Sequence, residues 1–128
     1  MTIRKAALRW LSLTHRVRDG DIFTSRYYPA AESWTGRDAW WVQIPMHRVE
    51  APGERFIHVV CESPQAAGAF HYLRVPAHFL RTHLDVLDRP GDGSVISLFL
   101  SAEPDTRFRD ERGAGLGFGE FLVPNGST

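Results

Sequence analysis

A chain of 128 residues, 43% hydrophobic and 23% charged, has the size and composition of one soluble domain with its own core. No apolar run approaches the roughly 20 residues that span a bilayer, and the N-terminus lacks the apolar segment of a signal peptide, so we expect a cytoplasmic protein without a membrane partner. Fifteen basic and fifteen acidic residues give a net charge of +0, which argues against a surface coated in non-specific nucleic-acid contacts.

The N-terminal segment carries most of the charge asymmetry. Residues 1–18 contain five basic side chains and no acidic one. Apolar residues recur there at helical spacing, which predicts an amphipathic helix over residues 2–18. Lys5, Arg9 and Arg16 share a flank away from the apolar arc and form a basic stripe. The stripe indicates either a phosphate-binding surface or an ordinary solvated helix face.

Two strands are predicted next along the chain. Residues 22–28 are rich in aromatic and β-branched side chains, and residues 40–49 alternate, with apolar side chains on one face and Trp41 on the other. Pro45 cannot donate a ladder hydrogen bond, so the second strand lies at a sheet edge or carries a bulge there. The turn at residues 51–54 then predicts an antiparallel hairpin with the strand that follows.

The middle of the chain predicts a hairpin with a helix folded back on it. Residues 56–62 and 69–75 have strand composition and are separated by a turn that contains proline and glycine. Pro76 suits a first helical position, and apolar residues at helical spacing extend that helix to Leu87. Cys61, the only cysteine, falls on an apolar strand face and is therefore interpreted as a buried thiol rather than a nucleophile.

The last third of the chain adds two strands, at residues 95–100 and 117–123, around a charged run at residues 103–112 that is interpreted as a solvated loop. The count is six strands and two helices. We therefore predict an α+β fold, with residues 1–128 as a single domain. Its curled six-stranded sheet is antiparallel or mixed, open or partly closed into a barrel, and packs on the N-terminal helix and the helix after the central hairpin.

A set of histidines and one carboxylate provides the only candidate for catalysis. His58 and Glu62 share one face of their strand, and the predicted hairpin would bring His47 to the same face, with His71 on the next strand. Such a group suits acid–base chemistry or a divalent metal, so His47, His58 and Glu62 are candidate catalytic residues. The alternative is a solvent-facing sheet surface. No paired ligand spacing is present, and we predict neither a metal site nor a cofactor.

Arginine and aromatic side chains are interleaved along the predicted strands. Arg26, Trp41 and Arg74 are the members expected to face a ligand, because such side chains stack bases and pair with phosphates. The same residue types are enriched in protein–protein hot spots. Trp34, in a loop, is predicted to pack as a lid over the core edge, with ligand contact as the alternative.

These patterns predict a non-catalytic nucleic-acid-binding module. Its contacts would come from the basic stripe of Lys5, Arg9 and Arg16 and from the sheet face of Arg26, Trp41 and Arg74. The first alternative is a protein-interaction or assembly subunit, which net neutrality favours. The second is a small metal-dependent enzyme or nuclease that uses the histidine and glutamate face.

Overall fold

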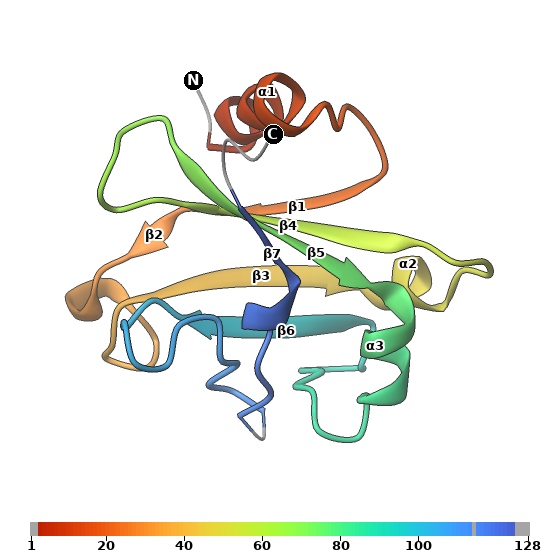
Figure 1. The fold of residues 1–128 in the computed structure, drawn as a ribbon. Coiled ribbons are helices and arrows are strands. Elements are labelled where there is room, and N and C mark those ends of the chain that lie inside the picture. The colour runs from red at the N-terminus through yellow and green to blue at the C-terminus, as the bar shows by residue number, and fades with distance from the viewer. Residues whose placement is uncertain (1–2, 114, 125–128) are drawn as a thin grey trace.

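Three layers make up the fold (Figure 1). The computed structural model describes residues 3–113 and 115–124, in which helix α1 (Ile3–His15) covers one sheet and that sheet packs on a second. The first sheet has the strand order β1-β4-β5-β7 and the second β2-β3-β6. The strands are β1 (Asp21–Ser25), β2 (Tyr27–Tyr28), β3 (Ala39–Pro45), β4 (Phe56–Glu62), β5 (Phe70–Pro76), β6 (Val95–Ser101) and β7 (Leu122–Val123). Helices α2 (Met46–Glu50) and α3 (Ala77–Thr82) and the 3₁₀ turns η1 (Ala30–Glu32) and η2 (Gly119–Phe121) complete the architecture.

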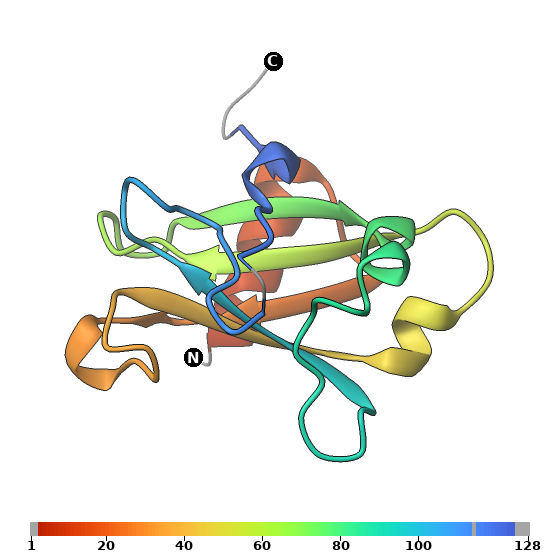
Figure 2. The same ribbon diagram turned by 90° about the horizontal axis from the view of Figure 1, so that it is seen from below.

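Strand alternation determines which face of each sheet is buried. On β3, Trp40, Val42 and Ile44 point into the core between the sheets, where they meet residues such as Leu73 and Val75 of β5. A second cluster fills the space between α1 and the four-stranded sheet and contains Ala7, Leu11, Ile22, Val60, Phe70 and Tyr72. Within the described residues, none of the helices α1, α2 and α3 covers the outer face of the three-stranded sheet, as the view from below shows (Figure 2).

The central hairpin and the fold class are confirmed. Strands β4 and β5 pair antiparallel from Phe56 opposite Pro76 to Glu62 opposite Phe70, and α3 follows directly. The single six-stranded sheet is wrong, because the described residues form two sheets of four and three strands, and these do not close into a barrel. Helix α3 is also shorter than predicted and ends at Thr82 rather than Leu87.

The predicted hairpin between residues 40–49 and 56–62 is wrong. Strand β3 ends at Pro45, whose φ of −60° and ψ of 135° lead into α2, so residues 46–49 are helical. Strand β3 pairs with β2 and β6 instead, while β4 pairs in parallel with β1. A short connection thus joins two different sheets rather than two neighbouring strands.

Three other predicted elements have different bounds in the structure. Helix α1 ends at His15, and Arg16 takes a left-handed φ of 59°, a conformation that ends helices. The predicted strand 22–28 is interrupted at Arg26, where the chain leaves the four-stranded sheet as β1 and enters the three-stranded sheet as β2. The predicted last strand shrinks to β7, which pairs with β5.

The two short helices belong to similar strand–proline–helix units. Pro45 ends β3 and Pro76 ends β5 with nearly equal backbone angles, and a histidine follows two residues later in each case, His47 and His78. Helices α2 and α3 pack side by side, and Arg81 donates a hydrogen bond to the Val49 carbonyl at 3.0 Å.

In the described part of the chain, no helix has the length and apolar character needed to cross a membrane.

The charged run at residues 103–112 is more than the solvated loop that we predicted. Asp110 is fully buried, and its carboxylate accepts the backbone N–H groups of Phe99, Arg112 and Gly113 at 3.1, 3.2 and 3.3 Å. Phe108, 2% exposed, packs on Trp40 inside the core. Burial raises the pKa of Asp110, an effect that the three N–H donors oppose. Asp110 therefore organises the loop from within.

The thiol of Cys61 is expected to be unreactive in the folded protein. Its side chain is fully buried, and burial raises the pKa of the thiol, so little thiolate forms and reagents have no access. We expect a thiol reagent such as DTNB at pH 8 to leave the native protein unlabelled and to react with one thiol per chain in denaturant. Rapid stoichiometric labelling of the native protein would contradict the buried position.

Candidate functional site: an aromatic pocket on the outer sheet face

An open pocket of about 410 Å³ lies on the outer face of the three-stranded sheet, at the end near η1. Four aromatic side chains line it, Tyr28, Trp34, Trp41 and Phe99, and we call it the aromatic pocket. Trp41 and Phe99 are direct cross-strand partners on β3 and β6. They share the outer face because their neighbours Trp40, Val42, Leu98 and Leu100 occupy the core.

The aromatic rings form a layered surface. The Trp41 and Phe99 rings are stacked, with centroids 5.8 Å apart and an interplanar angle of 22°, and Trp34 leans on Phe99 at 5.5 Å. Phe99 is nearly buried and forms the floor, whereas Trp41 is 37% and Trp34 65% exposed. Trp41 donates its indole N–H to the Ser97 hydroxyl at 2.8 Å, which fixes the ring orientation. The pocket thus offers exposed, prearranged π-surfaces.

Two arginines border the aromatic pocket. The Arg112 guanidinium lies 4.7 Å from the Trp34 ring centre, and the Arg26 guanidinium lies 4.0 Å from that of Tyr28. Each also makes an ion pair, Arg112 with Asp88 at 2.8 Å and Arg26 with Glu32 at 3.3 Å. The border of the pocket therefore carries two guanidinium groups, and Asp88 and Glu32 compete with any anionic ligand for them.

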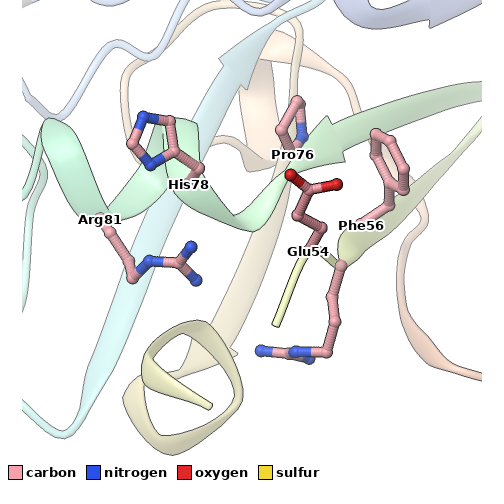
Figure 3. A pocket seen from close by; sticks show the side chains of 6 residues that line it. Glu54, Phe56, Pro76, His78 and Arg81 are labelled. Atoms are coloured by element: carbon pink, nitrogen blue, oxygen red, sulfur yellow. The ribbon is translucent and has the colours of Figure 1, made fainter. Parts of the chain in front are cut away.

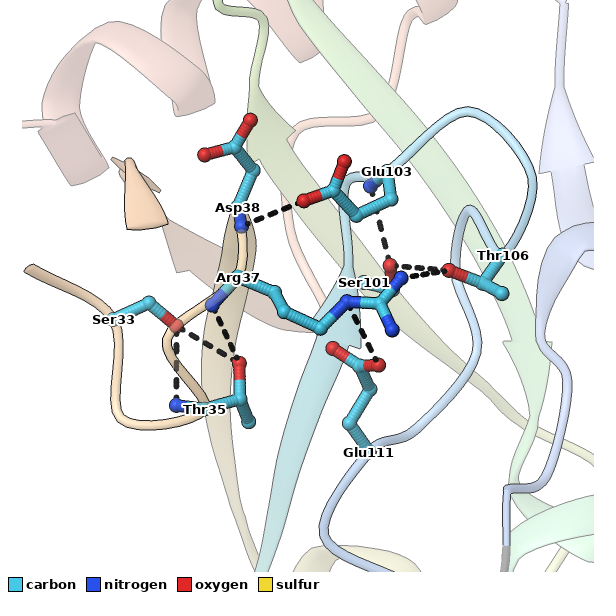
Figure 4. A network of polar contacts seen from close by, with 8 residues as sticks. All are labelled: Ser33, Thr35, Arg37, Asp38, Ser101, Glu103, Thr106 and Glu111. Atoms are coloured by element: carbon cyan, nitrogen blue, oxygen red, sulfur yellow. Dashed lines mark hydrogen bonds and ion pairs between the residues drawn. The ribbon is translucent and has the colours of Figure 1, made fainter. Parts of the chain in front are cut away.

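A polar network holds the loop that carries Trp34 (Figure 4). Ser33 and Thr35 bond to each other through their hydroxyls at 3.1 Å, and the Arg37 backbone N–H donates to Thr35. The Arg37 side chain then reaches the second loop, where it donates to the Thr106 hydroxyl at 3.2 Å and pairs with Glu111 at 3.7 Å. These links tie the Trp34 loop to the loop that Asp110 organises, so both sides of the pocket are braced.

The structure brings together only two of the predicted sheet residues. Trp41 lies on β3 inside the aromatic pocket, and Arg26, between β1 and β2, lies beside the pocket on the Tyr28 ring. Arg74 lies on β5, where its neighbours Leu73 and Val75 point into the core, so its side chain is on the outer face of the other sheet. Its guanidinium stacks on Phe56 at 3.8 Å. Trp41 and Arg74 therefore face away from each other.

The basic stripe is likewise divided. Lys5 and Arg9 are exposed on α1, but Arg16 follows the helix end and does not continue their row. Because α1 covers the four-stranded sheet, this helix and the aromatic pocket lie on opposite outer layers (Figure 1).

The candidate catalytic residues do not meet. His47 is on α2, while His58 and Glu62 lie on the α1 side of β4, and Glu62 accepts the backbone N–H of Tyr27 at 2.8 Å. His71 shares the core face with its partner Cys61, opposite to His58. Among the described residues, no group of three or more histidine, cysteine or acidic side chains is arranged to hold a metal.

A second pocket of about 410 Å³ lies at the other end of the strands, beside α3 (Figure 3). His78 and Arg81 of α3 face Glu54 and Phe56 across it. Arg55 also lines this pocket but is already committed to Asp21 and to the Arg48 carbonyl. This second pocket offers the Phe56 ring and side chains of both charges, which makes a less specific surface than the aromatic pocket.

Sequence reasoning assigned neither Phe99 nor Arg112 to a ligand-binding surface, and its favoured interpretation of Trp34 is wrong. Phe99 was hidden in an apolar run that indicates only burial, and its role depends on the pairing of β6 with β3. Arg112 reaches the pocket through the loop that Asp110 folds. Trp34 does not cover the core as predicted; it packs against Phe99 and is largely exposed, and ligand contact stays a prediction.

Comparison of the chain with protein-family models, with curated proteins and with solved structures found no match.

Proposed function

We propose that the chain binds single-stranded nucleic acid and that the aromatic pocket is where its bases stack. The observation that carries the proposal is the grouping of Tyr28, Trp34, Trp41 and Phe99 around one open pocket, with two tryptophans partly exposed. Bases present flat π-faces, and aromatic platforms of this kind bind them with little dependence on sequence. A base on Trp34 would also lie near the Arg112 guanidinium.

The arginines would supply the phosphate contacts. Arg26 lies on the Tyr28 ring and Arg112 on the Trp34 ring, and both can exchange their carboxylate partners for phosphate oxygens. Lys5, Arg9, Arg16 and Arg74 stay predictions as contacts outside the pocket. A single-stranded nucleic acid that reached these residues from the aromatic pocket would have to pass around the edge of the sheets.

A protein-interaction module is the alternative that one observation favours. Both arginines at the aromatic pocket are already ion-paired, and the chain has a net charge of +0, which weakens attraction to a polyanion. An aromatic-lined surface also accepts extended proline-rich peptides. The two functions differ in salt dependence, because phosphate contacts release counterions and apolar peptide contacts do not. The enzyme alternative gains no support from the separated His47, His58 and Glu62.

The test is fluorescence anisotropy of a labelled oligothymidylate at several salt concentrations. We expect binding at low salt whose log affinity falls with log salt by about 0.7 for each phosphate contacted. Trp34→Ala is expected to weaken binding by about 5- to 150-fold, the range for loss of one stacked base. Leu13→Ala, which removes a 74% exposed apolar side chain from α1, is the matched control and should bind normally. Equal affinity for Trp34→Ala and the control would remove the pocket from the proposal.

A further inference from the structure

Helix α1 packs on the four-stranded sheet (Figure 1), and a smaller pocket of about 300 Å³ lies where the end of this helix meets the sheet, on the face opposite to the aromatic pocket. It is lined by hydrogen-bonding and cationic side chains and by two valines: His15, His58, Tyr72, Arg74, Val17 and Val123. No carboxylate is among these lining residues. This composition differs from that of the other pockets, since two imidazoles, a phenol and a guanidinium share one small space.

Tyr72 is the centre of the group. Its hydroxyl lies 2.6 Å from His58 Nδ1, and its ring lies 5.0 Å from the His15 ring, centroid to centroid. Arg74 is the direct cross-strand partner of His58, so their side chains emerge side by side. The sheet register and the end of α1 therefore bring all four side chains to one place.

Several hydrogen-bonding positions in this group are unused. The Nε2 atom of His15 is buried and has no hydrogen-bond partner in the described part of the chain. Arg74 stacks on Phe56, but the described residues offer it no ion pair. The acid that acts on His58 is Asp21, which is engaged by Arg48 and Arg55. Burial lowers the pKa of His58, and the Arg74 charge lowers it further, so the permanent positive charge here belongs to Arg74.

We propose that this pocket binds a phosphate group, with Arg74 as its ion-pair partner and with His15 and the His58–Tyr72 pair as hydrogen-bond partners. Because Tyr72 and His58 Nδ1 bond to each other, the pair offers the phosphate one donor, either the His58 Nε2–H or the Tyr72 O–H. A tetrahedral oxyanion presents several strong acceptor oxygens, which suit a guanidinium fork surrounded by further donors. The phosphate can come from a small phosphorylated molecule or from a nucleic-acid backbone. The inference stands apart from the proposed function, because this pocket and the aromatic pocket lie on opposite outer faces.

The test follows the six imidazoles by ¹H–¹³C NMR during titration with inorganic phosphate and, separately, with a short single-stranded oligonucleotide. We expect saturable shifts of the His15 and His58 resonances, while His47, His71, His78 and His83 serve as internal references outside the pocket. Arg74→Gln should weaken this response by about tenfold or more, since it removes a charge-assisted pair. Arg89→Gln, which changes an exposed arginine outside this pocket, is the matched control and should respond like the wild type. Tyr72→Phe keeps the ring and removes the hydroxyl that bonds to His58 Nδ1, so a weakened response there supports the site independently of charge.

The two titrations also distinguish the source. A response to inorganic phosphate assigns the pocket to a free or small phosphate group, and a response to the oligonucleotide alone assigns it to a backbone phosphate. Absence of both responses overturns the proposal, as does an unchanged response in Arg74→Gln. Equal shifts of all six imidazoles also overturn it, because they indicate a general ionic effect.

Discussion

Replacing Asp110 by alanine is expected to lower the free energy of unfolding by about 3–5 kcal/mol, because three backbone N–H groups lose their buried acceptor. These N–H groups belong to β6 and to the loop beyond it. The loop has no room to adjust at Gly113, where a Cβ atom would lie 2.8 Å from the Asp110 carboxylate and against the Val86 carbonyl. Urea unfolding followed by tryptophan fluorescence measures the change.

Asp110→Asn is the matched control for this prediction. The amide oxygen can still accept from Phe99 and Arg112, whereas the amide nitrogen would face the Gly113 N–H, donor against donor. We expect a loss between that of the alanine variant and zero. An alanine variant as stable as the wild type would mean that the buried carboxylate does not organise the loop.

Removing two of the stacking surfaces together is expected to weaken binding of single-stranded nucleic acid by about 30-fold or more, because each base–aromatic stack is worth ~1–3 kcal/mol. The variant is Tyr28→Ala with Trp34→Ala, both on the open side of the aromatic pocket. Strand β2 pairs with β3 through backbone groups, so the fold should be retained. Anisotropy titration measures the affinity, and thermal unfolding checks the fold.

The control for the double variant removes two exposed apolar side chains elsewhere. Leu13 on α1 and Leu122 on β7 are 74% and 40% exposed and lie outside the aromatic pocket. Leu13→Ala with Leu122→Ala should bind as the wild type does. Similar losses in both double variants would show that the aromatic pocket has no special role.

Local signals predicted the parts of this fold that depend on neighbouring residues. The hairpin of β4 and β5 was predictable because its turn is short and both strands have strand composition, and the alternation in β3 correctly separated buried Trp40 from exposed Trp41. The boundaries at Pro45 and Pro76 share a proline followed two residues later by histidine. Comparing these two segments would have revealed α2 in advance.

The candidate site could not be predicted because it depends on contacts between distant segments. Phe99 meets Trp41 only through the pairing of β6 with β3, and Arg112 arrives by way of the buried Asp110. A run of alternating charge normally indicates a solvated surface, so the burial of Asp110 and Phe108 within it gave no local sign. Arg74 was grouped with Trp41 because sequence periodicity gives the face within one strand, but not which way different sheets point.

The location of bound nucleic acid tests the central claim most directly. A single-stranded oligonucleotide that carries 5-iodouracil, cross-linked by light and mapped by mass spectrometry, reports which aromatic side chains contact its bases. We expect cross-links at Trp34, with Tyr28 or Trp41 as further sites, and their loss when unlabelled oligonucleotide competes. Cross-links confined to α1 or to the four-stranded sheet, or none at low salt, would contradict base stacking in the aromatic pocket.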